Sequence, residues 1–345
     1  LYENPERYGD GTNWFDEMTR VAPVQKYDLS LFSANEKSST SAIFGYFKQE
    51  GVVINTQTQL ISLRLNQSYN VHKKVKVGFN LAPSYKLDDN ARLDTEGVND
   101  FFNKGMQASP LAVAYDENGE MPLLVNTPPM GNNINPVKKF KETKDDFKTL
   151  RLLANAYLDI EIIDDLTLST NASTDMTWES RAYFQPGSLA INGVANGIST
   201  YYQALAWTSE TNLTYQKEFL DDHKIEALAG FSAHKNQRES NELKGSPYST
   251  DKIPYLSAAT TITSGKSNFA EYAMLSYIGR LNYSFKGKYL LSGAMRRDGC
   301  SRFGVNQRWG SFPSVSAGWV LSEESFMKNI KPVDMLKLRA SYGVT

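Results

Sequence analysis

The stretch that decides the fold is Leu275-Ser-Tyr-Ile-Gly-Arg-Leu-Asn-Tyr-Ser-Phe285, followed by Lys286-Gly-Lys288 and Tyr289-Leu-Leu-Ser-Gly-Ala-Met-Arg-Arg297. In the first segment, apolar residues and glycine take the odd positions, and polar residues take the even positions except at Ile278. A period of two predicts a β-strand with one apolar face and one polar face. The lysines and glycine predict a tight turn, so we expect a long hairpin that ends in a loop over 298–310.

The same alternation recurs along the chain. It predicts twelve strands, several of them about 11 to 14 residues long, which is about twice the ordinary length. The segment 1–26 is expected to be an irregular extracellular segment in which Asn13 caps a short helix. The predicted strands cover 27–34, 41–48, 59–69, 75–85, 150–162, 166–178, 206–217, 224–237, 275–285, 289–297, 314–321 and 336–342, with a short helical connector over 323–329.

Short turns alternate with long connections between these strands. Long loops are expected over 86–147, 179–203 and 243–270. A transmembrane β-barrel has this asymmetry, with short turns on the periplasmic side and long loops outside the cell. We therefore expect an all-β, antiparallel, up-and-down transmembrane barrel, of which 27–345 would be a part. Aromatic residues beside the short turns would form a periplasmic girdle: Tyr69, Tyr215, Tyr283, Phe285 and Tyr289.

Composition bounds the function. The chain has 345 residues, 41% of them hydrophobic, and its formal net charge of -1 argues against a nucleic-acid binder. The 19 tyrosines and 17 phenylalanines suit interfacial girdles. The single cysteine, Cys300, excludes a disulfide framework within the chain. Because the chain begins at Leu1 without a signal-peptide pattern and stops within a predicted strand, we expect a piece of a longer protein.

Several motifs together resemble the SusC/RagA-type TonB-linked outer-membrane transporters of Bacteroidetes. The resemblance is carried by the run Tyr289 to Gly304, by Arg308 to Trp319 and by Leu336 to Thr345. Asn13-Trp-Phe-Asp, Ala22-Pro-Val-Gln25 and Gly45-Tyr-Phe-Lys-Gln-Glu-Gly51 fit as well. The signature residues are Arg296, Arg297, Asp298, Gly299, Arg302, Phe303, Trp309, Gly310, Phe312, Pro313 and Trp319. Cys300 departs from the small hydroxyl residue usual in the family and would lie in an extracellular loop.

The resemblance implies a barrel fragment that lacks the family's N-terminal plug. It implies active, TonB-dependent uptake of an oligosaccharide or a peptide across the bacterial outer membrane. The partners would be a SusD-like surface lipoprotein, the TonB–ExbB–ExbD complex acting through the plug, and the lipid around the barrel. Candidate substrate contacts are the aromatic residues predicted in the second long loop, for which loop packing is the alternative role: Tyr183, Phe184, Tyr201 and Tyr202.

No catalytic, cofactor or metal-binding constellation is recognisable. The chain lacks HExxH, GxSxG, phosphate-loop and EF-hand patterns, and its three histidines stand apart, so we expect no enzyme. Asp88-Asp89-Asn90 and Asp116-Glu-Asn-Gly119 are interpreted as turns rather than calcium sites. Arg296-Arg-Asp298 could bind an anion or form a charge network at the barrel rim. The alternative fold and function is a secreted, soluble β-sandwich or solenoid that binds glycans. Four asparagines in sequon-like triplets are predicted to face the lumen: Asn66, Asn171, Asn212 and Asn282.

Overall fold

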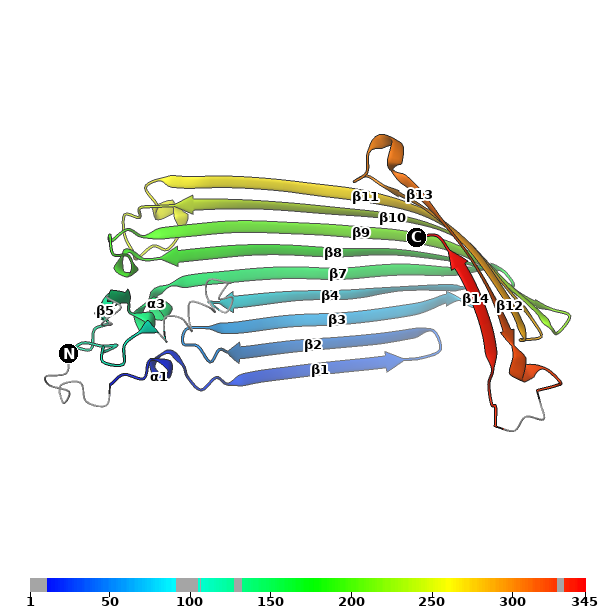
Figure 1. The fold of residues 1–345 in the computed structure, drawn as a ribbon, viewed down its shortest axis with the longest axis horizontal. Coiled ribbons are helices and arrows are strands. Elements are labelled where there is room, and N and C mark those ends of the chain that lie inside the picture. Colours follow the sequence, from blue (N-terminus) through cyan, green and yellow to red (C-terminus); the bar gives the residue numbers. More distant parts are fainter. Residues whose placement is uncertain (1–10, 91–104, 106, 127–131, 328–331) are drawn as a thin grey trace.

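Twelve strands form one antiparallel sheet in the computed structural model, which describes residues 11–90, 105, 107–126, 132–327 and 332–345. The order of strands in the sheet is their order along the chain, β1-β2-β3-β4-β7-β8-β9-β10-β11-β12-β13-β14. Figure 1 shows that β1 to β11 form a broad curved wall and that β12 to β14 turn away from it at one end. The fold prediction is confirmed: this is an up-and-down barrel wall, open between β1 and β14.

The elements have the following bounds. The strands of the large sheet are β1 Val24–Ala34, β2 Ser38–Glu50, β3 Gln57–His72, β4 Val75–Asp89, β7 Lys144–Ile163, β8 Leu166–Gln185, β9 Asn196–Phe219, β10 His223–Gly245, β11 Ile262–Phe285, β12 Tyr289–Cys300, β13 Trp309–Val320 and β14 Lys337–Gly343. The remaining elements are α1 Trp14–Met18, β5 Leu124–Asn126, β6 Asn132–Ile134, α3 Pro136–Glu142, and the 3-10 turns η2 Gly187–Leu189, η3 Leu256–Ala258, η4 Val305–Gln307 and η5 Leu321–Glu323.

Short turns gather at one end of the wall and long connections at the other. At the short-turn end, β7 meets β8 through Asp164 and Asp165, and β11 meets β12 through 286–288. Asp165, Lys286 and Gly287 have positive φ angles of 70°, 53° and 66°, which lets the chain reverse within two or three residues. The connection from β13 to β14 departs from this rule, since it runs over 321–336.

The long connections are shorter than predicted because the strands continue into them. The second loop, predicted over 179–203, is confined to 186–195 between β8 and β9. The third covers 246–261 instead of 243–270, and the last covers 301–308, so Cys300 ends a strand instead of lying in a loop. The first is cut to 90–143. Likewise β1 begins at Val24, inside the segment predicted to be irregular. In place of the helix predicted over 323–329, the described residues have the 3-10 turn η5, which ends at Glu323, and a turn over 325–327.

The register between strands fixes two faces. Residues paired across an antiparallel ladder point to the same side of the sheet. Phe285 pairs with His223 and Tyr289, and Leu281 pairs with Ala227 and Gly293, so the odd positions of β10, β11 and β12 share one face. We call this the outer face. The opposite one, which carries Glu226, Arg280 and Asn282, is the inner face, because it lines the hollow described below.

A glycine on the inner face admits a close aromatic contact. Gly78 of β4 pairs with Tyr157 of β7, whose ring lies over it. A Cβ atom at Gly78 would stand 2.5 Å from the Tyr157 hydroxyl oxygen and 2.7 Å from the Gln67 carbonyl oxygen. By contrast, nothing lies within 4 Å of the corresponding Cβ position at Gly279 of β11.

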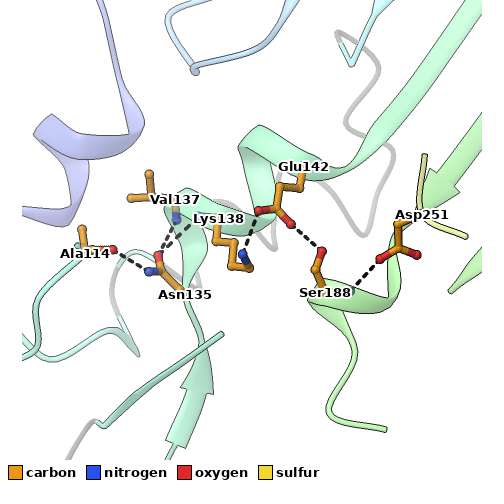
Figure 2. A network of polar contacts seen from close by, with 7 residues as sticks. All are labelled: Ala114, Asn135, Val137, Lys138, Glu142, Ser188 and Asp251. Carbon is orange, nitrogen blue, oxygen red and sulfur yellow. Dashed lines mark hydrogen bonds and ion pairs between the residues drawn. The ribbon is translucent and has the colours of Figure 1, made fainter. Parts of the chain in front are cut away.

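A small core packs α1 against described residues of the first long connection, beyond the ends of the strands. Asn13 caps α1 by accepting from the Phe15 amide, as the sequence predicts, and the Trp14 indole donates to the Ser109 carbonyl oxygen at 2.9 Å. The core consists of Trp14, Met18, Ala108, Ala114, Val125, Val137 and Phe140. The fully buried Asn135 caps α3 and donates to the Ala114 carbonyl oxygen at 2.8 Å (Figure 2). The described residues of the first long connection therefore pack around a core of their own.

Candidate functional site

The outer face presents a continuous apolar band. The outward side chains are uncharged over residues 225–233 of β10, 275–285 of β11 and 289–295 of β12, and Leu281 and Leu291 are each 53% exposed. No second layer covers them, because the only other sheet among the described residues is the two-stranded pair β5 and β6. The outward residues of the band on these strands are Ile225, Ala227, Ala229, Phe231, Tyr283, Leu281, Gly279, Tyr277, Leu291, Gly293 and Met295.

A row of stacked rings borders the band at the short-turn end. The ring centroids of Phe219 and His223 are 5.1 Å apart, and those of His223 and Phe285 are 4.7 Å apart. Phe285 continues to Tyr289 at 6.1 Å, and Tyr289 to Trp319 at 6.4 Å. The row therefore crosses five strands. His223, which lies just outside the predicted strand 224–237, is the first residue of β10 and lies between two aromatic rings.

Glu324 in the connection from β13 to β14 holds two members of this row. The Tyr289 hydroxyl donates to Glu324 Oε1 at 2.6 Å, and the Trp319 indole donates to the same oxygen at 3.1 Å. These hydrogen bonds hold the pKa of Glu324 below its usual value, and the bond from Tyr289 has the largest effect. The polar atoms of both rings thus point away from the band and toward the short-turn end, as in the aromatic belts of membrane proteins.

A second aromatic group borders the band on the opposite side. Phe231 and Tyr277 have ring centroids 5.4 Å apart, and Tyr277 and Trp309 have theirs 6.1 Å apart. Four residues beyond Phe231 on β10, the outer face becomes charged, with Lys235 Nζ 3.2 Å from Glu271. The distance from Phe285 to Tyr277 along the strand is about 26 Å. At the usual tilt of barrel strands this corresponds to about 20 Å along the membrane normal. This is close to the apolar height of membrane barrels.

The inner face is hydrophilic and hollow. Next to the short turns it lines a hollow of about 1000 Å³ beside Glu226, Asn282, Ser292 and Arg339. Arg280 donates to Glu226 at 2.7 Å, and Gln216 and Asn282 donate to the same carboxylate. Farther along, the side chains of Asn80, Asn155 and Asn171 form a hydrogen-bonded ladder across three strands. The register places all four sequon asparagines on this face: Asn66, Asn171, Asn212 and Asn282.

The predicted girdle residues lie on one face. Tyr283, Phe285 and Tyr289 belong to the outer aromatic row or adjoin it, since the Tyr283 hydroxyl lies 2.8 Å from His223 Nδ1. Tyr69 and Tyr215 are outward as well, because they pair with Val77 and Leu166 of the outer face. His223 was missed as a member because the turn beside it was taken to extend over it.

The candidate substrate residues do not lie together. All four belong to strands: Tyr183 and Phe184 to β8, Tyr201 and Tyr202 to β9. By register, Tyr183 and Tyr202 face inward, whereas Phe184 and Tyr201 face outward. Phe184 is only 3% exposed, under Tyr248 at a ring-centroid distance of 5.0 Å. Only the two inward tyrosines can meet a molecule in the lumen.

An aromatic and charged patch surrounds Tyr183 near the long connections. Arg181 Nε lies 2.6 Å from Asp145 Oδ1, and its second nitrogen donates to Oδ2 at 2.8 Å. The guanidinium stands over Phe147 and Tyr183, at 5.2 and 5.6 Å from their ring centroids. The two hydrogen bonds to Asp145 hold the Arg181 guanidinium rigidly, and its contact with the Tyr183 ring orients that ring.

The signature residues divide between the two faces. Arg296 points inward, where its Nε donates to both oxygens of Asp298 at 2.8 Å. Of the two interpretations of the motif Arg296-Arg-Asp298, an anion site or a charge network, the structure has the charge network. Arg297 points outward and lies over Trp309, with its guanidinium 5.4 Å from the ring centroid.

The remaining signature residues shape this end of the hairpin. A Cβ at Gly299 would meet the Trp309 ring at 2.9 Å, and a Cβ at Gly310 would meet the Phe312 ring at 2.8 Å, so each glycine lets an indole or phenyl ring lie flat on the backbone. Arg302 lies 3.9 Å from the Tyr272 ring centroid. Phe303 is exposed, and Pro313 pairs with Met295 in the ladder. Trp319 lies at the other end of β13 and is the last ring of the aromatic row beside the short turns.

Polar contacts tie three long connections to one another (Figure 2). Lys138 and Ser188 both donate to Glu142, at 2.7 and 2.6 Å, which joins α3 to η2. Asp251, from the connection between β10 and β11, accepts from the amides of Gly187 and Ser188 at 2.9 and 3.2 Å. These three connections therefore form one joined rim at the end of the wall.

Among the described residues, no helix is both long enough and apolar enough to cross a membrane. In the same parts of the chain, no group of three or more His, Cys, Asp or Glu side chains is arranged to hold a metal ion.

An exposed apolar band between aromatic rows, backed by a polar hollow, defines part of the wall of a transmembrane β-barrel. Comparison with known proteins identifies the family. The chain belongs to the family described as TonB dependent receptor-like, beta-barrel, which matches residues 78–345. It is therefore part of an outer-membrane protein, in a family of receptors rather than of enzymes.

The similar proteins include curated receptors and solved structures. TonB-dependent receptor P3 of Formosa agariphila is 28% identical over 352 residues, covering 99% of this chain and 35% of the relative. SusC of Bacteroides thetaiotaomicron is 49% identical over 72 residues, 21% of this chain and 7% of SusC. A structure of the RagAB peptide transporter has a TM-score of 0.80 and 23% identity, covering 97% of this chain and 38% of that one. The chain spans about a third of the length of the curated receptors that match nearly all of it.

Proposed function

We propose that this chain forms part of the barrel wall of a TonB-dependent transporter that imports a nutrient across the outer membrane. The observation that carries the proposal is the pairing of an exposed apolar outer face with a hydrophilic, hollow inner face on the same strands. Apolar side chains that no protein layer covers are stable next to hydrocarbon, and charged inner side chains are stable next to water. The alternative of a soluble β-sandwich or solenoid is wrong, because a sandwich would cover Leu281 and Leu291 with a second sheet and the family is one of barrels.

The nutrient is an oligosaccharide or a peptide, held at the rim by the inward aromatic side chains. Tyr183, oriented by Arg181, and Tyr202 on the neighbouring strand are the side chains that we assign to substrate contact. Tyrosine rings stack on sugar faces and on peptide groups, and their hydroxyls exchange hydrogen bonds with either. The likeness to the RagAB peptide transporter supports the peptide class.

The partners that fit this role are a SusD-like surface lipoprotein and the TonB–ExbB–ExbD complex. The joined rim of long connections supports the first, because it offers a stable surface outside the membrane. The family supports the second, since its members are TonB-dependent receptors. The energy would be delivered through a plug domain of the full-length protein.

Uptake by cells tests the proposal. Deletion of the full-length gene should abolish growth on, and uptake of, one nutrient from a panel of oligosaccharides and peptides, and loss of TonB should have the same effect. Uptake that persists without TonB would contradict the proposal.

Two adjacent residues provide a matched test of the binding role. Tyr202→Ala should raise the KM for uptake, because Tyr202 faces the lumen. Tyr201→Ala removes the same ring from the outer face and should leave uptake unchanged. Equal effects of the two substitutions would contradict the assignment.

A further inference from the structure

The two adjacent arginines of β12 have opposite surroundings. Arg296 lies on the inner face, where Asp298 neutralises it and the buried Ser276 hydroxyl accepts a further hydrogen bond at 3.2 Å. Arg297 lies on the outer face, because it pairs with Tyr277 and with Ser311 in the ladders of β11 and β13. Its side chain is exposed, and among the described residues no carboxylate pairs with it.

Arg297 stands at the edge of the apolar band. Below it on the same face of β12 are Met295, Gly293 and Leu291, none of which is charged. Its level in the sheet is that of Tyr277 and Phe231, the rings that border the band on the side of the long connections. An outward arginine is strongly unfavourable at the middle of a bilayer and much less so at its border. The position therefore places the guanidinium among lipid headgroups.

The guanidinium is held ready for a ligand. It lies over the Trp309 ring, 5.4 Å from the ring centroid, and Trp309 in turn stacks on Tyr277, so the guanidinium has an aromatic surface on one side. A cation–π contact of this kind restricts the arginine side chain without using the hydrogen-bonding capacity of its N–H groups. Those N–H groups match the oxygens of a phosphate, which accepts two parallel hydrogen bonds from one guanidinium.

We propose that Arg297 and Trp309 form a binding site on the outside of the barrel for the phosphate of an outer-leaflet lipid headgroup. Charge complementarity and continuity with the lipid-facing band favour a lipid over any other occupant. The phosphate can belong to a phosphorylated glycolipid or to a phospholipid. In either case the site anchors the barrel at the outer border of the membrane, opposite the row that Glu324 holds.

Native mass spectrometry of the full-length protein in detergent tests the site. The probes are lipid A carrying phosphate, the same lipid A after phosphatase treatment, and phosphatidylglycerol. Arg297→Gln should weaken binding of phosphorylated lipid A by at least about tenfold, the size expected for a lost charged hydrogen bond. Arg339→Gln is the matched control, because this exposed arginine of β14 faces inward. The Arg339→Gln protein should bind phosphorylated lipid A as tightly as the wild-type protein does.

The comparison of lipids on the wild-type protein does not depend on any variant folding. Dephosphorylated lipid A should bind weakly. Displacement of lipid A by phosphatidylglycerol would show that any headgroup phosphate suffices, and failure to displace it would assign the site to the glycolipid; both support a phosphate site. Equal binding of the two forms of lipid A would overturn the proposal. So would an unchanged affinity of Arg297→Gln, or an oligomer of the protein that this variant dissociates.

Discussion

An arginine in the centre of the apolar band should destabilise the barrel strongly. Leu281 lies on the outer face four residues from Phe285 and four from Tyr277, so its side chain is about 10 Å in height from each aromatic border. That is the middle of the band. Leu281→Arg should therefore lower the free energy of unfolding by about 2–4 kcal/mol, the full cost of an arginine at the bilayer midplane.

The neighbouring position provides the control. Asn282 faces inward and donates to Glu226, a carboxylate that would accept an arginine as well. Asn282→Arg should change the free energy of unfolding by less than about 1 kcal/mol. Both variants of the full-length protein would be unfolded with urea from lipid vesicles and followed by tryptophan fluorescence and by the mobility shift of unheated samples in gels. A loss at position 282 as large as that at position 281 would refute the assignment of the two faces.

Three further changes test other parts of the structure. Gly78→Ala should destabilise the barrel by about 1–3 kcal/mol, because the new methyl group collides with the ring that lies over this glycine, whereas Gly279→Ala should have no such effect in the same unfolding assay. Glu324 has a folded-state pKa below its ordinary value of 4.5, so its stabilising effect should be complete above about pH 4.5 and vanish as the pH falls through the lower folded value; Glu324→Gln should abolish that part of the acid dependence of stability, and an unchanged profile would contradict it. Asp251→Asn should weaken the amide hydrogen bonds that join two long connections, and hydrogen exchange at Ser188 should quicken severalfold; unchanged exchange would show that the contact does not hold the rim.

The sequence was sufficient for the membrane-spanning part of the fold. Between Leu275 and Phe285, hydrocarbon on one side and water on the other impose a strict alternation, and this pattern predicted the hairpin and both of its faces. The same reasoning applied to 150–162 and 166–178, where the structure has the two predicted strands paired with each other. Asn13 was also recognisable, because a helix cap depends on local sequence.

The strands beyond the membrane could not be read from alternation. Above Lys235 both faces of β10 meet water, so Gln237 and Arg238 lie on opposite faces with no difference in polarity to reveal it. For this reason β8 was predicted to end too early and β9 to begin too late, and Tyr183 and Tyr202 were placed in a loop. The contacts of the rim were equally out of reach, since the bond between Glu142 and Ser188 joins residues 46 positions apart.

Collision of spin labels with oxygen and with a water-soluble nickel complex tests the two faces most directly. Each residue from 275 to 285 would be replaced in turn by a labelled cysteine, in full-length Cys300→Ser protein reconstituted into lipid vesicles. The account predicts that oxygen, which concentrates in lipid, is favoured at the odd positions from 277 to 285 and that nickel is favoured at the even positions. Accessibility without a period of two, or with the two reagents exchanged between the faces, would contradict the account.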